Sequence, residues 1–264
     1  MLKPSTGVAS RFTVRFDTVE ELADRVRVFN ARLDQGRPEF LRHMRGRWVV
    51  EEFLDGQAFS VESLVAGGVV SHVAVCEKGA IQGPYFREIG HSSPPRVADR
   101  VARELRRLAE QVIHLIGIDD CVTHAEFKVV GEQPVLLEIG ARMGGGSIRQ
   151  VVRNATGVDL LDLTMQLAMG RTPVATPVDG GAAASRSLYP ASAGTVASVD
   201  TGPIAAQPGI VDVNLWLAKG DTYRLPPDGY GEVLGVVAAA ETADEAIRLA
   251  QHAIEVARER TVLV

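Results

Sequence analysis

Apolar and polar positions alternate along several short stretches of the chain, which is the pattern of half-buried β-strands. Residues 57–78 read as two strands that meet at Gly67 and Gly68, a pair typical of a hairpin turn. Residues 121–130 and 134–140 read as a second hairpin. The same reasoning predicts strands in five other segments, 10–16, 47–56, 182–199, 210–217 and 232–240.

A periodicity of three to four residues predicts helices over 17–33 and 96–117, one or two helices in 147–169, and a last helix that begins after Thr242. Thr18 and Glu21 have the spacing of a capping box, as do Thr242 and Glu245. Helices and strands do not alternate strictly, and hairpins are frequent. The expected fold class is therefore α+β with an antiparallel sheet. In the helix over 96–117 we expect one apolar stripe, formed by Val97, Val101, Leu105, Leu108, Val112 and Leu115.

Composition narrows the class of protein. The chain has 264 residues, 46% hydrophobic and 23% charged, which is enough to bury a core in one large domain or two lobes. A net charge of −5 provides no basic field for nucleic acid. Cys76 and Cys121 form neither a disulfide framework nor a zinc spacing, and no apolar run approaches the length of about 18 residues needed to span a membrane. We expect a cytoplasmic protein that binds neither nucleic acid nor membrane.

Residues 134–150 combine a strand, a glycine-rich turn and the start of a helix. Such a loop is typical of dinucleotide or S-adenosylmethionine sites. Arg142, however, stands where those loops require a small residue, and a hairpin precedes the turn in place of a crossover helix. The pattern therefore disfavours that interpretation.

A three-residue connection at 131–133 places Glu126 directly opposite Glu138, and alternation puts His124, Glu126 and Lys128 on one face. Two carboxylates opposite each other repel unless a cation lies between them. Oxygen ligands of this kind suit magnesium together with nucleotide phosphates. A zinc deaminase would need a Cys-x-x-Cys pair, which the chain lacks, so His124 is expected to be a sheet residue near the site.

Arg142 follows Glu138 by four residues and can bind phosphate through its forked guanidinium group. Gly144, Gly145 and Gly146 lead into a helix whose first N–H groups favour an anion. Together these features fit phosphoryl transfer from a nucleotide. The simpler alternatives are a surface ion pair between Glu138 and Arg142 or Lys128, and a merely flexible glycine turn.

With these residues in view, the chain resembles the ATP-grasp superfamily, most closely its carboxylate–amine ligases of the L-amino-acid ligase (dipeptide synthetase) type. Four stretches carry the resemblance: 83–97, 123–130, 136–148 and 155–170. The resemblance implies an ATP-grasp fold with a partial ATP-binding lobe and an antiparallel-sheet C-terminal lobe. It also implies ATP and Mg²⁺ or Mn²⁺ as cofactors, with Glu126 and Glu138 as metal ligands and Arg142 stabilising the transferred phosphoryl group.

The resemblance extends to the nucleotide and the substrate. It implies catalytic roles for Lys3, Glu138 and Arg142, and nucleotide contacts from Lys3, Ser5, Gly7, Ser10, Glu51, Glu52, Phe53 and Leu54. It implies substrate contacts from Glu88, His91, Gly144 and Gly145. On the residues alone, Lys3 could equally be a solvated terminal charge, 50–54 a strand with exposed glutamates, and His91 a loop histidine.

The chain departs from this family in three places. Ala58 stands near a position where many relatives carry a ribose-binding glutamate, and Gly140 stands where many have a metal-ligating asparagine. Relatives also carry an N-terminal domain and the beginning of the ATP-binding lobe before the stretch that matches Lys3. We therefore expect three regions: a partial nucleotide-binding lobe over 1–56, a catalytic lobe with the metal site over 57–175, and a C-terminal α+β subdomain over 176–264.

The expected function is an ATP- and magnesium-dependent ligase that joins a carboxylate, such as that of an amino acid, to an amine through an acyl phosphate. The rival is a non-catalytic nucleotide-binding remnant or one half of a split ATP-grasp enzyme, and a third option is another ATP-grasp chemistry. The expected partners are small carboxylate and amine substrates, with a homodimer or a complementing N-terminal chain as the macromolecular alternatives.

Overall fold

The computed structural model describes residues 1–7, 10–34, 47–82, 85–178 and 180–264. Contacts within the chain divide it into two compact units. Unit 1 comprises Met1–Leu54, Ile81–Glu88 and Arg224–Gly231, and unit 2 comprises Asp55–Ala80, Ile89–Tyr223 and Glu232–Val264. This grouping is by contact and not by sequence range, so the three regions expected from the sequence stay a prediction.

Unit 1 is built on two short antiparallel strands, β1 (Leu2–Pro4) and β2 (Trp48–Val50), and on helix α1 (Val19–Asp34). A second strand pair, β5 (Ile81–Gln82) and β6 (Arg87–Glu88), belongs to the same unit. Its core consists of Leu2, Phe12, Val14 and Phe29. The Phe12 ring meets Phe29 edge-on, and the Phe12 backbone N–H donates to the Tyr230 hydroxyl, so the distant segment Arg224–Gly231 closes this core.

Two sequence predictions in unit 1 need correction. The predicted strand over 10–16 is reduced to an isolated bridge between Leu2 and Val14, because Ser10 and Phe12 have positive φ angles of 52° and 59° that break an extended strand. The predicted strand over 47–56 ends at Val50, and Glu51–Leu54 continue without regular structure. The capping box is confirmed, since the Glu21 N–H donates to Thr18 Oγ1 over 3.2 Å.

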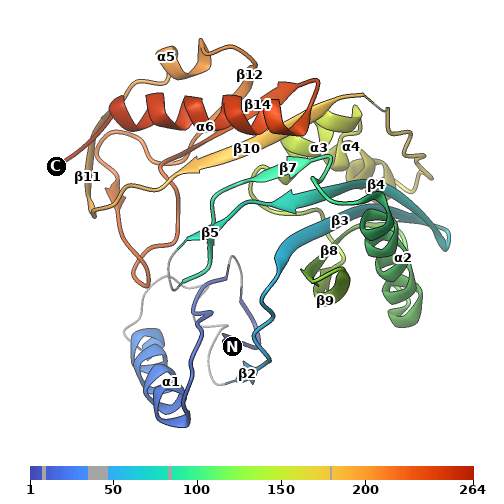
Figure 1. The fold of residues 1–264 in the computed structure, drawn as a ribbon, viewed down its shortest axis with the longest axis horizontal. Helices are drawn as coiled ribbons and strands as arrows, with labels where there is room; N and C mark the ends of the chain where they lie inside the picture. The colour runs from blue at the N-terminus through green and yellow to red at the C-terminus, as the bar shows by residue number, and fades with distance from the viewer. Residues whose placement is uncertain (8–9, 35–46, 83–84, 179) are drawn as a thin grey trace. The chain divides into compact units, whose positions relative to one another are not determined.

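Unit 2 contains an eight-stranded sheet in the order β12-β14-β10-β7-β4-β3-β8-β9, with every neighbouring pair antiparallel (Figure 1). The predicted α+β class with an antiparallel sheet is confirmed. The strands of this sheet are β3 (Gln57–Ala66), β4 (Val69–Lys78), β7 (His91–Ser93), β8 (Cys121–Val130), β9 (Gln133–Gly140), β10 (Ala182–Leu188), β12 (Ile210–Leu215) and β14 (Leu234–Ala240). A smaller sheet joins β11 (Gly194–Val199) to β13 (Thr222–Tyr223) and β15 (Thr261–Leu263).

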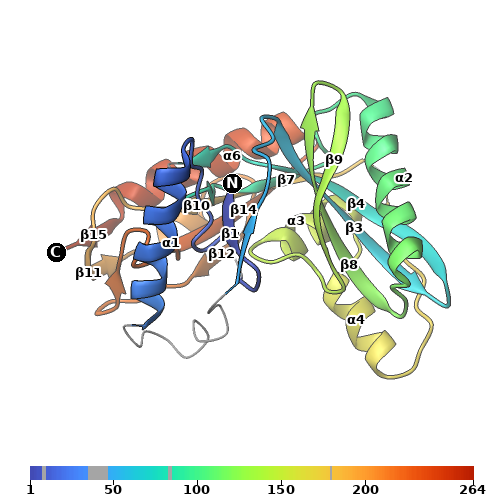
Figure 2. The ribbon, with the colours of Figure 1, turned by 90° about the horizontal axis from the view of Figure 1, so that it is seen from below.

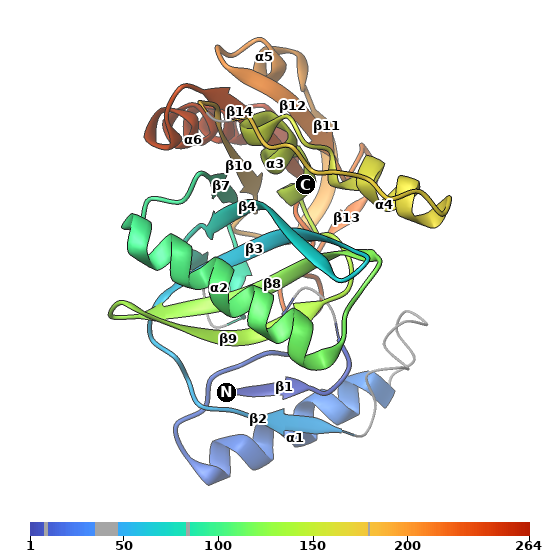
Figure 3. The same ribbon diagram turned by 90° about the vertical axis from the view of Figure 1, so that its right-hand side faces the viewer.

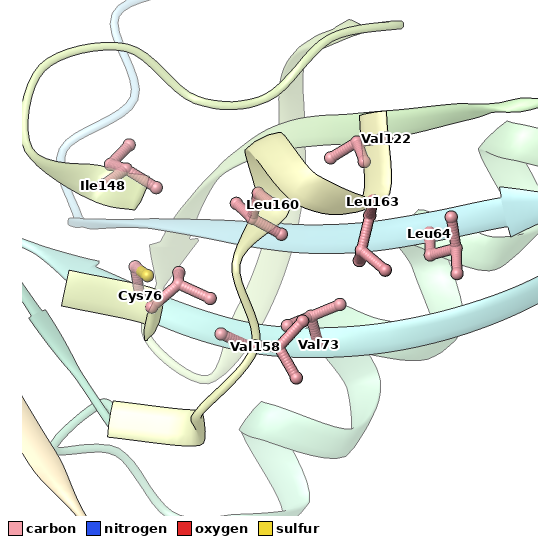
Figure 4. Packing of buried hydrophobic residues seen from close by; sticks show 10 residues of the cluster. Leu64, Val73, Cys76, Val122, Ile148, Val158, Leu160 and Leu163 are labelled. Carbon is pink, nitrogen blue, oxygen red and sulfur yellow. The ribbon is translucent and has the colours of Figure 1, made fainter. Parts of the chain in front are cut away.

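Five helices belong to unit 2: α2 (Asp99–Ile116), α3 (Ile148–Thr156), α4 (Leu160–Ala168), α5 (Gly202–Ala205) and α6 (Ala243–Glu259). Helix α2 packs on the sheet face formed by Phe59, Val61, Val75, Ala125 and Phe127 (Figures 2 and 3). Helices α3 and α4 pack on the opposite face, where Ile148, Leu160 and Leu163 meet Leu64, Cys76 and Val122 (Figure 4). Helix α6 lies against β10 and β14, and Thr242 caps it through the N–H of Glu245.

The predicted stripe of α2 is only partly correct. Val101 and Leu105 are buried, but the other buried positions are Ala102, Ala109 and Ile113, and Leu115 is 84% exposed. The buried face therefore follows the small residues Ala102 and Ala109, which let the helix approach the sheet closely. Leu115 lies off this face in the last turn before Gly117, whose φ of 71° ends the helix.

The second hairpin has a different turn from the predicted one. Strand β8 ends at Val130 and β9 begins at Gln133, so the turn has two residues, Gly131 and Glu132, and Gly131 takes a φ of 63°. Near the turn, each residue of β8 is therefore paired with the residue of β9 one position before the predicted partner. A bulge between Phe127 and Glu126 absorbs the shift, and Glu126 and Glu138 are paired as predicted.

Candidate functional site

A row of charged side chains crosses the sheet face on which α3 and α4 pack. Glu126 on β8 is paired with Ser60 on β3 and with Glu138 on β9. Side chains of paired residues lie on the same face, so the two glutamates point to the same side of the sheet. Glu62, on β3, lies opposite His124 on β8.

His124 bridges two carboxylates. Its Nδ1 lies 2.6 Å from Glu62 Oε1, and its Nε2 lies 2.8 Å from Glu126 Oε1. Glu62 is fully buried and His124 nearly so. Burial alone lowers the pKa of His124, but the two carboxylates outweigh it and raise the pKa to about 9. The imidazole is therefore charged at neutral pH and donates from both ring nitrogens. The expectation that His124 lies on the sheet beside the glutamates is met.

Lys78 completes the row. Its Nζ lies 2.6 Å from Glu126 Oε2, and its side chain is almost entirely buried. Each oxygen of Glu126 thus faces one cationic donor, His124 or Lys78. A carboxylate oxygen has two lone pairs and can accept more than one such contact.

The pair Glu126 and Glu138 is the candidate metal site. Glu138 is exposed and makes no hydrogen bond or ion pair with the other residues in the described ranges. Among those residues, no three His, Cys, Asp or Glu side chains gather as a metal-binding group. Two facing carboxylates nevertheless fit a magnesium ion, which is commonly held by one or two carboxylates plus substrate phosphates.

The glycine-rich turn lies over this row. A Cβ on Gly144 would lie 2.9 Å from His124 Nδ1 and 2.7 Å from Ile148 Cδ1, so only glycine fits there without displacing a neighbour. A Cβ on Gly146 would lie 3.9 Å from His91 Cε1. Gly145 has open space around it. Arg142 is exposed and donates from Nη1 to the Met143 carbonyl oxygen over 3.0 Å.

His91 occupies the strand next to Lys78, its pairing partner in β4. It is buried, and its backbone N–H donates to Ser185 Oγ over 3.0 Å. Glu232 lies within electrostatic range of His91. Burial raises the pKa of the Glu232 carboxyl. Hydrogen bonds from Ser187, Trp216 and Tyr189 and the charge of His91 lower this pKa, but burial has the larger effect. His91 therefore belongs to a polar cluster of unit 2, and the interpretation of it as a plain loop residue is wrong.

The residues expected to contact the nucleotide all belong to unit 1. Lys3 Nζ lies 2.7 Å from Glu51 Oε2, so these two candidates form an ion pair. The Arg15 guanidinium group lies over the Phe53 ring, 4.7 Å from its centroid. Glu52 is exposed and Leu54 half-buried, and Ser5, Gly7 and Ser10 are exposed. Residues 8 and 9 of the same predicted stretch lie outside the described residues.

The candidates are divided between the units. Glu88 ends β6 in unit 1 together with the nucleotide candidates. His91, Glu126, Glu138, Arg142, Gly144 and Gly145 belong to unit 2. Ala58, the departure from the family pattern, is 6% exposed on β3. The structure thus places the two metal candidates on one sheet face and Arg142 in the turn after β9, while the nucleotide candidates belong to unit 1.

Sequence reasoning missed Glu62, Lys78 and Glu232. The signal for Glu62 was present, since polar Ser60 and Glu62 alternate with apolar Phe59 and Val61. Lys78 follows Cys76 with the same period. Glu232 carries no local signal, because it precedes its strand and meets its partners only through tertiary contacts.

No helix among the described residues is long and apolar enough to cross a membrane.

Comparisons with known proteins identify the family of the chain. The model of the ATP-grasp domain family matches residues 1–150, and that of L-amino acid ligase C-terminal domain 2 matches residues 186–260. The uncharacterized protein y4rH of Sinorhizobium fredii is 26% identical over 258 residues, which are 97% of this chain and 52% of that protein. The alanine–anticapsin ligase of Bacillus subtilis is 26% identical over 133 residues, or 46% of this chain and 28% of the enzyme.

The crystal structure of an L-amino acid ligase from Bacillus licheniformis superposes with a TM-score of 0.81 at 21% identity, covering 100% of this chain and 63% of that one. The likeness confirms the ATP-grasp fold. The chain spans only about half to two thirds of the length of y4rH and of this ligase. Because the ATP-grasp domain model matches more than half of its residues, the chain belongs to the ATP-grasp domain family.

Proposed function

We propose that this chain forms the metal- and phosphate-binding part of an ATP-dependent ligase that joins a carboxylate to an amine. One observation carries the proposal. Glu126 and Glu138 face each other on the sheet, and Glu126 contacts the buried side chains of Lys78 and His124 beneath a glycine-rich turn. Family membership supports the same reaction class, and the alanine–anticapsin ligase is a relative whose name describes such a coupling.

The proposed reaction has two steps. A carboxylate oxygen of the first substrate attacks the γ-phosphorus of ATP, and the bond to the β-phosphate oxygen breaks, so an acyl phosphate and ADP form. The nitrogen of the second substrate then attacks the acyl carbon. The C–O bond to phosphate breaks, the nitrogen loses a proton, and an amide and inorganic phosphate result.

The roles of the residues follow from their chemistry. Glu126 and Glu138 would hold Mg²⁺ or Mn²⁺, whose charge reduces the repulsion between the phosphates and the attacking carboxylate. Arg142 is exposed, and its forked donors suit the charge on the transferred phosphoryl group. The backbone N–H groups at the start of α3 favour the same anion. These assignments are proposals for single residues.

Binding of the nucleotide and the substrate is assigned to the remaining candidates. Lys3 and Glu51 to Leu54 would contact ATP from unit 1, where the ion pair between Lys3 and Glu51 holds two of them together. Gly144 and Gly145 would let a substrate approach the backbone closely, and His91 would contact its polar groups. For Glu88, in unit 1, a substrate contact is proposed from the resemblance alone. An amino acid is the proposed carboxylate substrate.

Release of ADP tests this proposal. The purified chain is incubated with Mg²⁺, ATP and mixed amino acids, and hydroxylamine is added to trap the acyl phosphate as a hydroxamate. We expect ADP and hydroxamate from the wild type and none above background from Glu138→Gln. Glu132→Gln is the matched control, because Glu132 is an exposed glutamate at the turn of the same hairpin. Equal turnover in Glu138→Gln and the wild type would contradict the proposal.

The same assay distinguishes the proposed ligase from the rival interpretation, a non-catalytic remnant or one half of a split enzyme. If the wild type yields no ADP and its thermal midpoint does not rise with Mg²⁺ and ATP, the chain alone is a non-catalytic remnant. If a longer form of the protein, or a second chain that supplies the preceding domain, restores both signals, the chain is one part of a larger ligase.

A further inference from the structure

The row of charged side chains on the sheet contains two buried residues, Glu62 and His124, in addition to the two proposed metal ligands. Glu62 is fully buried, and its Oε2 has no hydrogen-bond partner among the described residues. Burying a carboxylate is costly unless a charged partner compensates it. His124 is that partner, yet it also contacts Glu126. Apolar residues in place of a buried ion pair are often neutral for folding, so the fold alone does not account for this pair.

The bridging geometry constrains Glu126. The two ring nitrogens of His124 point to carboxylates on adjacent strands, and both distances are short, 2.6 Å to Glu62 and 2.8 Å to Glu126. The ring cannot turn without losing one of these bonds. The glycine turn leaves no room for a side chain beside the ring, since a Cβ on Gly144 would lie 2.9 Å from Nδ1. Because both ring nitrogens are engaged, the contact of Nε2 also restrains Oε1 of Glu126.

We propose that His124, fixed by Glu62, is a positioning residue that orients the Glu126 carboxylate for the divalent cation it shares with Glu138. This inference rests on the proposed function, because it concerns the same cation. His124 touches neither substrate nor nucleotide in this scheme and acts only through Glu126. Such outer partners of metal ligands commonly change metal affinity by about 10- to 100-fold.

The contacts of Glu126 support the same role. Its Oε1 lies 2.8 Å from His124 Nε2, and its Oε2 lies 2.6 Å from Lys78 Nζ. Each oxygen therefore has a buried partner that holds the carboxylate in one orientation, and His124 is the partner that a second buried residue, Glu62, fixes in turn.

Binding of Mn²⁺, followed by the electron paramagnetic resonance signal of the free ion, tests this role without relying on turnover. In the Glu62→Leu/His124→Leu variant both buried charges are replaced together by apolar side chains, a change that is often neutral for folding. We expect its Mn²⁺ dissociation constant to rise about 10-fold or more. Glu62→Gln keeps a polar partner for the ring and should retain most of the affinity.

A neighbouring histidine supplies the matched control. His72, on β4, is half-buried and forms a hydrogen bond with Ser63 Oγ over 2.9 Å. His72→Leu should leave Mn²⁺ affinity unchanged. If the leucine pair does not fold in a urea titration, Glu62→Gln/His124→Asn replaces it, because asparagine is too short to contact both neighbours. In a turnover assay, the variants should raise the Mg²⁺ concentration at half-maximal rate more than they lower the rate at saturation.

The outcomes are distinguishable. Wild-type Mn²⁺ affinity in the folded double variant, with binding lost in Glu138→Gln, would overturn the role of His124 and leave the metal pair intact. Absence of Mn²⁺ binding to the wild type, or unchanged binding in Glu138→Gln, would overturn the metal site and with it this inference.

Discussion

The guanidinium group of Arg96 forms two hydrogen bonds with the carboxylate of Glu77. Arg96 Nη2 lies 2.7 Å from Oε1, Nε lies 3.2 Å from Oε2, and the Arg96 backbone N–H donates to Oε2 over 2.8 Å. The same side chain reaches Asp244 in the first turn of α6 over 3.3 Å. Glu77 is buried at the end of β4, so Arg96 compensates its charge and ties the segment before α2 to both β4 and α6.

Replacing Arg96 should therefore destabilise unit 2. In Arg96→Met the Glu77 carboxylate stays buried without its cation, and we expect the free energy of unfolding to fall by about 3 kcal/mol, the low end for a broken buried pair because Arg96 is itself half-exposed. Urea denaturation measures the change. Arg107→Met is the control, since Arg107 forms only an exposed pair with Glu104 within α2. Equal stability of the two variants would refute this view of Glu77.

Alanine substitutions at Gly144 and Gly145 should affect stability differently. Gly144→Ala should cost about 1–3 kcal/mol of stability, because its Cβ would press on His124 and Ile148. Gly145→Ala should fold as the wild type does, since its Cβ meets no atom within 4 Å. Thermal unfolding of both variants tests the difference. If Gly144→Ala melts at the same temperature as Gly145→Ala, the turn does not lie against His124 as described.

His72 should make stability depend on pH. Burial lowers the pKa of His72 below the ordinary value of 6.5. Arg106 lowers the pKa further, while Glu110, at 3.9 Å, raises it by less than burial lowers it. Between the lowered pKa and about 6.5, the unfolded chain binds a proton at His72 that the folded chain does not. The free energy of unfolding must then fall as pH falls through 6.5 toward the lowered pKa.

Urea denaturation at pH 7.5 and 5.5 checks this sign. We expect His72→Gln to lose less stability on acidification than the wild type does, because glutamine cannot take up the proton. His252→Gln, an exposed histidine on α6, should keep the wild-type dependence. A His72→Gln variant with an unchanged pH dependence would show that His72 does not carry the effect.

Local patterns predicted much of the framework. The hairpin at Gly67 and Gly68, the capped helix after Thr242 and the antiparallel class follow from turn glycines, capping residues and period-two alternation, which act over a few residues. Even the pairing of Glu126 with Glu138 was predictable, although the turn was placed one residue too long. A bulge between Glu126 and Phe127 restores the register, and no residue pattern in the hairpin indicates its position.

The network around Glu126 shows where local reasoning ends. His124 was placed on the right face, but its bond to Glu62 joins residues 62 positions apart, and Lys78 reaches Glu126 across β3 from β4. The stripe of α2 was misjudged for a related reason. Periodicity ranks leucines above alanines, whereas the sheet selects the small residues that allow close approach.

The sequence by itself determined the two hairpins, most of the helices and the carboxylate pair that binds a metal in the proposed function, because turn and pairing preferences are local. Only the tertiary structure decided that Glu126 is bridged to a buried glutamate through His124 and neutralised by Lys78. Burial makes such contacts necessary, since a charge removed from water needs a partner, and which partner it meets depends on strands brought together from distant parts of the chain.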